Sequence, residues 1–179
     1  METSNTYSFD RDLCTICTKL DTISQTNQQM LEQIHLDEVS KSYRKHEEYI
    51  QRQHAAFTEM EEHVRNDPER SQVHAGNFQR VFEGNKSDLG LDALYKGVTG
   101  RGLVFSRPIL DVYFQHCGGK RGVMEARCSH LIHLFQIGLL ALMTYTTVTE
   151  DDEDQVKEKW AGRLAGIQAK MEDMLRRCN

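Results

Sequence analysis

Cysteines and histidines are the residues of this chain best suited to metal or redox chemistry. Cys14 and Cys17 are three residues apart, the spacing of half a zinc site or of a redox pair. A zinc site needs a second pair at comparable spacing, but Cys117, Cys128 and Cys178 are single. A thioredoxin-like pair follows a strand, whereas this pair begins an expected helix. We therefore interpret Cys14 and Cys17 as part of a helix-packing surface.

Histidines also fail to form a recognisable metal motif. His130 and His133 are on one face of an expected helix, and His116 and Cys128 lie nearby in the sequence. No His-Glu-x-x-His motif is present. The acidic run at residues 150–154 lacks the alternating ligands, central glycine and distant glutamate of a calcium loop. We expect no metal ion and no cofactor.

One loop has the character of an anion site. The glycine-rich segment Gly118–Gly122 places Lys120 and Arg121 at the start of an expected helix. Backbone amides and the helix dipole favour a phosphate or a lipid headgroup at such a position. We name Lys120 and Arg121 as the candidate anion-binding residues, with a solvated loop as the alternative.

No catalytic centre can be identified. The chain shows no glycine-flanked nucleophilic serine and no recognisable Ser-His-Asp order. Its many carboxylates fall on expected exposed helix faces, where nothing would shift their pKa values. We predict that the protein has no catalytic residues and is not an enzyme.

The N-terminal part of the chain carries the longest apolar repeat. From about Phe9 to about Val64 a single long helix is expected, and its first half has apolar residues spaced alternately by three and four. This heptad pattern, which we call the N-terminal seam, predicts a partner-binding surface. The seam residues are Leu13, Ile16, Leu20, Ile23, Asn27, Met30 and Ile34. A buried Asn27 would set register and partner number at some cost in stability.

Shorter helices and a second seam follow. Pro68 suits a helix start that Asp67 can cap, and Thr149 is expected to cap the last helix, with the acidic run in its first turn. The other helices are expected at about 68–82, 88–98, 106–117 and 123–148. The second seam comprises Val156, Trp160, Leu164, Ile167, Met171, Met174 and Cys178.

Together these patterns predict an all-α fold. No segment shows the period-two alternation of a strand, and only 2 prolines interrupt the chain. We predict one domain over residues 1–179, with residues 1–8 disordered, built as an elongated antiparallel bundle with long coiled-coil-like helices at both ends. An intermolecular coiled coil through the N-terminal seam is the alternative.

The net charge of the chain bears on its possible partners. Its N-terminal residues and its cysteines bear on the cellular compartment. A net charge of -5 argues against general nucleic-acid binding, which needs a basic surface. The polar residues 1–12 include no apolar secretory core, and the cysteines are scattered and odd in number. We expect reduced thiols and a cytoplasmic protein.

The most apolar segment, Leu131 to Met143, has 13 residues. This is short of the roughly 18–20 residues that span a bilayer. A buried central helix is the favoured interpretation, and a membrane-inserting element is the alternative.

Several packing segments resemble those of the rapunzel and cephalotoxin-like proteins, which are best represented in fish. They are residues 20–27, Pro108–Asp111, Ile137–Met143 and the acidic patch leading to Trp160, in order over about Asp12 to Cys178. The resemblance implies a helical protein without known catalysis, in a family linked to skeletal and fin development and to a secreted venom toxin. Family members begin with an apolar segment rich in valine, glycine and alanine, and this sequence is expected to lack it.

These observations favour a non-enzymatic interaction or regulatory protein, acting through helical faces in development or signalling. Its partner would be another protein or a second copy of the chain. A membrane-active, toxin-like protein that inserts the helix at residues 131–143 is the alternative function.

Overall fold

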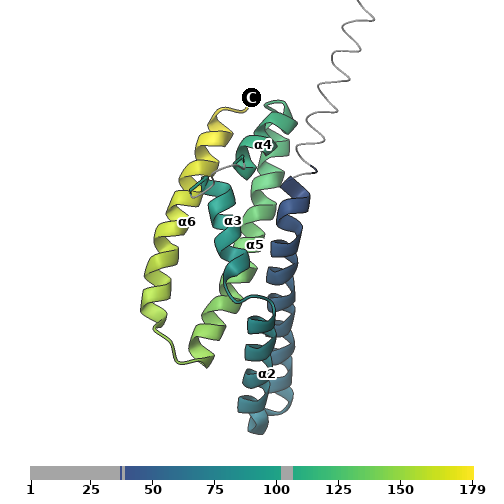
Figure 1. Cartoon of the computed structure of the whole chain (residues 1–179), viewed down its shortest axis with the longest axis vertical. Coiled ribbons are helices and arrows are strands. Elements are labelled where there is room, and N and C mark those ends of the chain that lie inside the picture. The colour runs from purple at the N-terminus through teal and green to yellow at the C-terminus, as the bar shows by residue number, and fades with distance from the viewer. Residues whose placement is uncertain (1–36, 38, 102–106) are drawn as a thin grey trace, which may run out of the picture.

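The computed structural model describes residues 37, 39–101 and 107–179. Helices are the only regular elements among them, which confirms the all-α prediction. They form an elongated bundle whose helices follow its long axis (Figure 1). The N-terminal seam, with Asn27, and the pair Cys14 and Cys17 lie outside the described residues.

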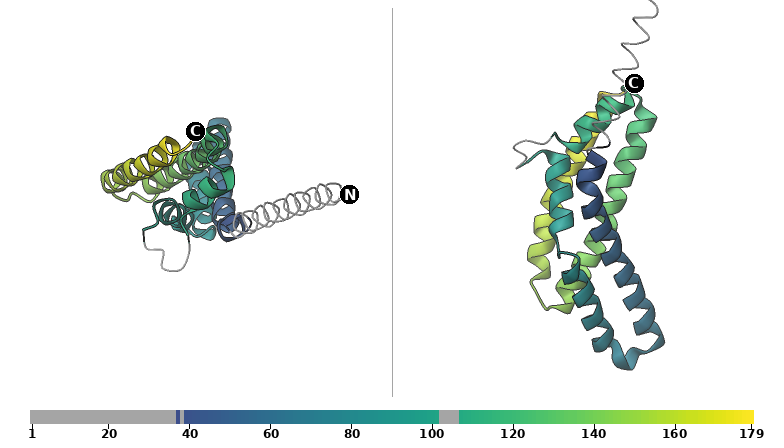
Figure 2. Two further views of the ribbon diagram at one scale, coloured as in Figure 1. Left: turned by 90° about the horizontal axis from the view of Figure 1, so that it is seen from above. Right: turned by 45° about the vertical axis from the view of Figure 1, so that its right-hand side comes forward.

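The chain runs down and back up the bundle twice (Figures 1 and 2). A helix over residues 39–66, called the first helix below, turns back through a short 3-10 helix, η1 (Pro68–Arg70), into α2 (Ser71–Gly84). α3 (Leu89–Thr99) and α4 (Ile109–Cys117) follow in the upper half. α5 (Arg121–Val148) then descends, and α6 (Glu153–Arg176) returns antiparallel to it.

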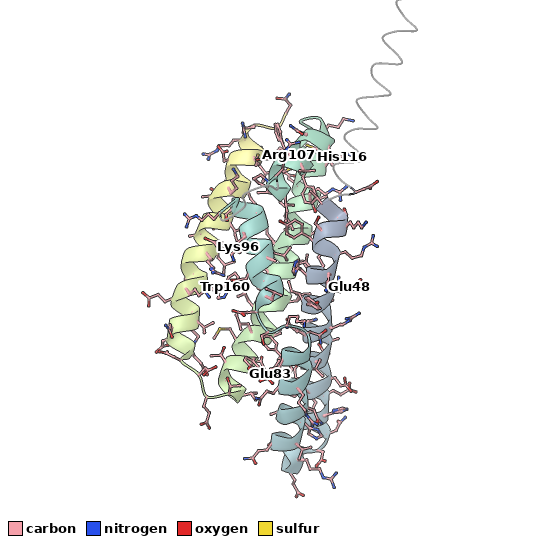
Figure 3. The ribbon with its side chains drawn as sticks, viewed as in Figure 1. Glu48, Glu83, Lys96, Arg107, His116 and Trp160 are labelled. Carbon is pink, nitrogen blue, oxygen red and sulfur yellow. The ribbon has the colours of Figure 1, made fainter. Side chains whose placement is uncertain are left out.

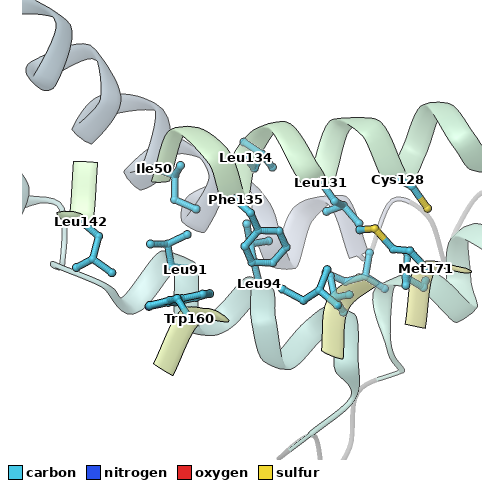
Figure 4. Close-up of a cluster of buried hydrophobic side chains, with 14 of the residues drawn as sticks. Ile50, Leu91, Leu94, Cys128, Leu131, Leu134, Phe135, Leu142, Trp160 and Met171 are labelled. Carbon is cyan, nitrogen blue, oxygen red and sulfur yellow. The ribbon is translucent and has the colours of Figure 1, made fainter. Parts of the chain in front are cut away.

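α5 is the central helix, in contact with α2, α3, α4 and α6. It is apolar on most of its circumference, which is typical of a helix enclosed by others. Leu131, Leu134 and Phe135 are almost fully buried in the core, where side chains of the first helix, α3 and α6 meet them (Figure 4). Burial of this helix is the main hydrophobic contribution to the fold.

Gly138 allows the first helix and α3 to approach α5 closely. A Cβ atom at Gly138 would lie 2.6 Å from Cδ2 of Leu91 and 3.2 Å from Cγ2 of Ile50. Both side chains are fully buried, so they have little space in which to move. The missing side chain is therefore what lets three helices meet at this level.

A buried amide holds the connection between α2 and α3. Gln53 of the first helix is only 1% exposed. Its Nε2 donates to the carbonyl oxygens of Phe82 (3.2 Å), Asn85 (3.2 Å) and Ser87 (2.6 Å). These bonds satisfy backbone oxygens at a corner where Lys86 and Ser87 have left-handed backbone angles.

α3 and α6 are joined by a charged and aromatic cluster. The Arg163 guanidinium is hydrogen-bonded to the Asp92 carboxylate and lies over the rings of Tyr95 (4.5 Å) and Trp160 (4.8 Å). Trp160 points from α6 toward α3 (Figure 3) and also contacts Phe135 of α5. Ring faces attract the cation, so Arg163 stabilises this joint in two ways.

Two predicted helix caps are wrong. Asp152, not Thr149, caps α6, because the Asp152 Oδ1 accepts a hydrogen bond from the Gln155 N–H (3.1 Å). Thr149 instead ends α5, where its hydroxyl donates to the Tyr145 carbonyl (2.8 Å). Asp67 precedes η1 but makes no side-chain cap bond.

Several predicted boundaries also shift. The first helix continues to residue 66, α3 passes through Gly97 to Thr99, and α5 begins at Arg121 rather than Val123. α3 ends where Gly100 adopts a left-handed φ of 75°, a conformation that glycine accepts without strain. α6 ends at Arg176, two residues before Cys178.

Two glycine substitutions should have opposite effects on stability. Gly138→Ala should lower the free energy of unfolding by about 1–2 kcal/mol, because the new methyl group overpacks the core. Gly166→Ala in α6 is the matched control, since no atom beyond the nearby backbone of its own helix lies within 4 Å of the added Cβ. It should raise stability by up to about 1 kcal/mol through helix propensity. Urea unfolding followed by circular dichroism measures both, and equal effects would contradict the close approach at Gly138.

Candidate functional site

A largely apolar hollow with a volume of about 480 Å³ lies between α5 and α6. We call it the α5–α6 groove. From α5 it is lined by Cys128, Ile132, Phe135, Gln136 and Leu139. From α6 it is lined by Leu164, Ile167, Gln168, Met171, Glu172 and Leu175. A volume of this size is in the range of ligand and peptide-anchor sites.

Helical periodicity produces this groove. The apolar lining residues of each helix recur at intervals of three and four, so they form one stripe along the helix. Because α5 and α6 are antiparallel neighbours, the two stripes face each other. Phe135, Ile167 and Met171 close the floor and are nearly fully buried.

The rim of the groove exposes apolar side chains to solvent. Ile132 is 43% exposed and Leu164 is 39% exposed. Leu164 belongs to the predicted second seam, whose residues Trp160, Ile167, Met171 and Met174 are buried as expected. Single exposed apolar side chains are common on proteins, and here two of them border one apolar hollow.

Polar groups at the rim are amides and one carboxylate. Gln168 donates from Nε2 to the Glu172 Oε1 (2.9 Å). Gln136 is exposed on the opposite wall. Such groups can hydrogen-bond a polar residue of a partner, and they set orientation rather than chemistry.

The one thiol in the groove is poorly suited to nucleophilic chemistry. Burial raises the pKa of Cys128 to about 11, with smaller contributions from Cys178, Cys117 and Glu125. The thiolate is the reactive form, so at neutral pH almost all of Cys128 is the unreactive thiol. The thiol of the groove is therefore not an activated nucleophile.

At the predicted anion site, Arg121 already has hydrogen-bond partners within the protein. Arg121 donates from Nε to the Glu125 carboxylate (2.9 Å) and from its guanidinium to the Leu175 carbonyl (3.3 Å). The Arg121 backbone N–H donates to the Asn179 oxygen (3.2 Å). Lys120 stands before the first turn of α5. Glu125 is four residues from Arg121 and could be anticipated from the sequence, whereas the acceptors at Leu175 and Asn179 come from the other end of the chain.

The described histidines occur at several separate places along the bundle, and only some of them have charged partners. His130 faces Glu47 of the first helix, with 3.6 Å between Nε2 and Oε2. At the hairpin end of the bundle, His74 Nε2 is 3.9 Å from an Asp67 carboxylate oxygen. The ring centroids of His63 and His74 are 5.1 Å apart. Within residues 39–101 and 107–179 no three His, Cys, Asp or Glu side chains are grouped as a metal site.

The central helix α5 has a longer apolar stretch than the 13 residues expected from the sequence. α5 has 28 residues, and its most apolar window of 18 residues has a mean hydropathy of 1.6. By length and composition alone it could span a membrane, although 39% of that window is buried inside the bundle. The estimate of 13 residues was too short because it stopped at Met143.

Comparison with known proteins identifies the family. Residues 8–179 match the family model described as the cephalotoxin-like middle helical domain. The chain is also 39% identical over 168 residues to "Protein rapunzel" of Danio rerio, which covers 94% of this chain and 73% of that protein. This chain belongs to the rapunzel and cephalotoxin-like family.

Membership of the rapunzel and cephalotoxin-like family confirms the resemblance found in the packing segments. The family match begins at residue 8 and so includes the N-terminal seam. No solved structure matches the chain significantly. The arrangement of α5 and α6 therefore rests on the structure described above.

Sequence reasoning missed the groove although its residues were visible. The second seam and a buried central helix were predicted, but the hollow between them was not. A usable signal was the spacing of Ile132, Phe135 and Leu139 on α5, which repeats the spacing of the α6 stripe. What the sequence could not give is that the remaining helices all cover other faces of α5.

The state of Cys128 can be tested by alkylation. With a pKa near 11 instead of 9.0, Cys128 in the folded protein should react with iodoacetamide at pH 8 about 100-fold more slowly than an ordinary thiol. Its rate should still rise between pH 9 and 11. Peptide mapping by mass spectrometry gives the rate at each cysteine, with the urea-unfolded protein as control. Equal rates in folded and unfolded protein would contradict this burial.

Proposed function

We propose that this protein is a non-enzymatic interaction protein that binds a helix of its partner in the α5–α6 groove. The observation that carries the proposal is the apolar hollow with Ile132 and Leu164 exposed at its rim. Amphipathic helices bind such grooves through anchors at intervals of three and four residues. The groove wall from Leu164 to Leu175 covers 11 helical steps, about 17 Å or three turns.

Several further features support binding rather than catalysis. The groove contains apolar anchors and amides, and its thiol is held protonated by burial. Cys117, Cys128 and Cys178 are free thiols, as in proteins of reducing compartments. These free thiols support our proposal that the protein acts inside the cell. The developmental or signalling role is part of the same proposal.

The proposal predicts that a charge at the groove rim abolishes partner binding. Leu164→Asp and Ile132→Asp each place an unpaired carboxylate against the apolar surface, which should weaken binding at least about tenfold. Val73→Asp in α2 is the matched control, since Val73 is 58% exposed and does not line the groove.

The measurement has two steps. Partners are captured from cells with wild type and the three variants, and each candidate is then purified and titrated by calorimetry. Binding that survives in Val73→Asp but is lost in both rim variants supports the function. If a direct partner binds both rim variants as tightly as it binds the wild type, binding through the groove is refuted.

A membrane-active function is the second candidate, favoured by the length and hydropathy of α5. Leu140 is 45% exposed on this helix, which gives lipid a point of first contact. This function predicts that the purified protein floats with liposomes after density centrifugation. Neutral and anionic liposomes should be compared. Protein that stays at the bottom with both would remove this candidate, because an inserting helix must bind lipid.

A further inference from the structure

Three thiols lie close together at the end of the bundle where α4 and α6 finish (Figure 1). Cys117 is the last residue of α4, Cys128 lies near the start of α5, and Cys178 follows the end of α6. We propose that Cys117 and Cys178 form a reversible intramolecular disulfide, which joins α4 to α6. Cys128 stays outside this bond. The disulfide goes beyond the proposed function, because it needs no partner protein.

Backbone hydrogen bonds hold the two cysteines side by side. The Asn179 N–H donates to the Gly119 carbonyl oxygen (2.8 Å), and an Asn179 oxygen accepts from the Arg121 N–H (3.2 Å). Cys178 directly precedes Asn179, and Cys117 lies two residues before Gly119. The chain at Cys178 is therefore fixed against the loop that follows Cys117.

Side chains of the last turn of each helix also meet. The Arg177 guanidinium lies over the Phe114 ring, 5.5 Å from its centroid. The Cys117 thiol donates to the Phe114 carbonyl (3.1 Å), and the Cys178 thiol donates to the Met174 carbonyl (3.4 Å). Each thiol is thus held at the end of its own helix, where α4 and α6 contact each other.

The two thiols interact with each other directly. Partial burial raises the pKa of Cys178, and the Cys117 thiol raises this pKa further through its charge and through a hydrogen bond. Burial raises the pKa of Cys128, to which Cys178 and Cys117 contribute only through their charges. Cys117 and Cys178 are therefore the pair in contact.

The bond can close without moving a helix. A disulfide brings its sulfur atoms to about 2.05 Å and needs Cα atoms about 4.4–6.8 Å apart. Cys178 lies beyond Arg176, the last residue of α6, so its backbone can shift while α6 keeps its place. Cys117 is followed by Gly118, which already has a left-handed φ of 60°. A side-chain rotation and a small shift at Cys178 are sufficient.

Exchange with oxidised glutathione forms the bond in two steps. Cys178 is half-exposed and Cys117 is buried, so the Cys178 thiol loses its proton and attacks the glutathione disulfide first. One glutathione leaves as a thiolate and takes up a proton. The Cys117 thiolate then attacks the Cys178 sulfur and releases the second glutathione. Two protein thiols and one oxidised glutathione thus give one protein disulfide and two reduced glutathiones, with two electrons passing to glutathione.

Proximity, and not an activated thiol, favours this bond. The raised pKa of Cys178 slows the first attack, because only the thiolate reacts. At equilibrium the native fold favours the disulfide, since it keeps two thiols together that are distant in the sequence. In the unfolded chain the same thiols meet only through loop closure. The equilibrium constant against glutathione should therefore be at least about tenfold larger in the native protein than in urea.

Equilibration of the full chain in glutathione buffers of varied ratio tests the bond. Trypsin places Cys117, Cys128 and Cys178 on separate peptides, so mass spectrometry after acid quenching and alkylation identifies each link. The link between Cys117 and Cys178 should be the main disulfide among these three cysteines, and it should form within one chain. The same titration in urea gives the equilibrium constant of the unfolded protein.

Two variants separate this pair from the other thiols. Oxidation should raise the Tm of the wild type by about 5–15 °C, and dithiothreitol should reverse the shift. Cys128→Ala is the matched control and should keep the shift. Cys178→Ser, at a half-exposed position, should lose it. Since Cys178→Ser retains Cys14 and Cys17, it also accounts for any effect of that pair.

Three results would overturn the disulfide. The first is a lasting adduct of Cys178 with glutathione and no link to Cys117. The second is a link from Cys178 to Cys128 or to another chain in place of Cys117. The third is an equilibrium constant that is equal in the native and unfolded protein. The wild-type titration gives all three readouts, so the test stands even if a variant fails to fold.

Discussion

The close approach of three helices at Gly138 is the constraint on which the rest of the bundle depends. Ile50 and Leu91 occupy the volume that a side chain at this position would fill. The first helix and α3 are thereby brought against one face of α5, and the hairpin between the first helix and α2 follows them. α6 is left to pack on the remaining side, with Trp160 reaching Phe135. The α5–α6 groove is thus a consequence of how the other faces of α5 are used.

Helical periodicity explains why the fold class was predictable and the site was not. The spacing of apolar residues indicated a helix to about Val64, and the structure confirms one over residues 39–66. Gln53 is a polar residue of that helix, yet it is buried, and its amide bonds to three backbone oxygens. Burial depends on partners distant in sequence, and a local pattern contains no information about them.

Competing hydrogen bonds explain the errors at helix ends. Thr149 and Asp152 are both suitable cap residues, and the choice depends on where the chain turns. The turn uses a left-handed Glu150, with a φ of 56°, so α6 begins after it. At the predicted anion site, Arg121 already bonds to Glu125 and to the backbone of Asn179, and the second of these partners is distant in the sequence. Leu164 shares the spacing of the buried seam residues, but it lies at the open rim of the groove.

Gln53 holds the corner between α2 and α3 through the backbone of the corner. Its amide bonds only to the carbonyl oxygens of Phe82, Asn85 and Ser87 there. This contact therefore depends on the course of the chain at Asn85 and Ser87 and not on which side chains these positions carry. A single amide on the first helix thus fixes the path of a segment that lies 29 residues or more away in the sequence.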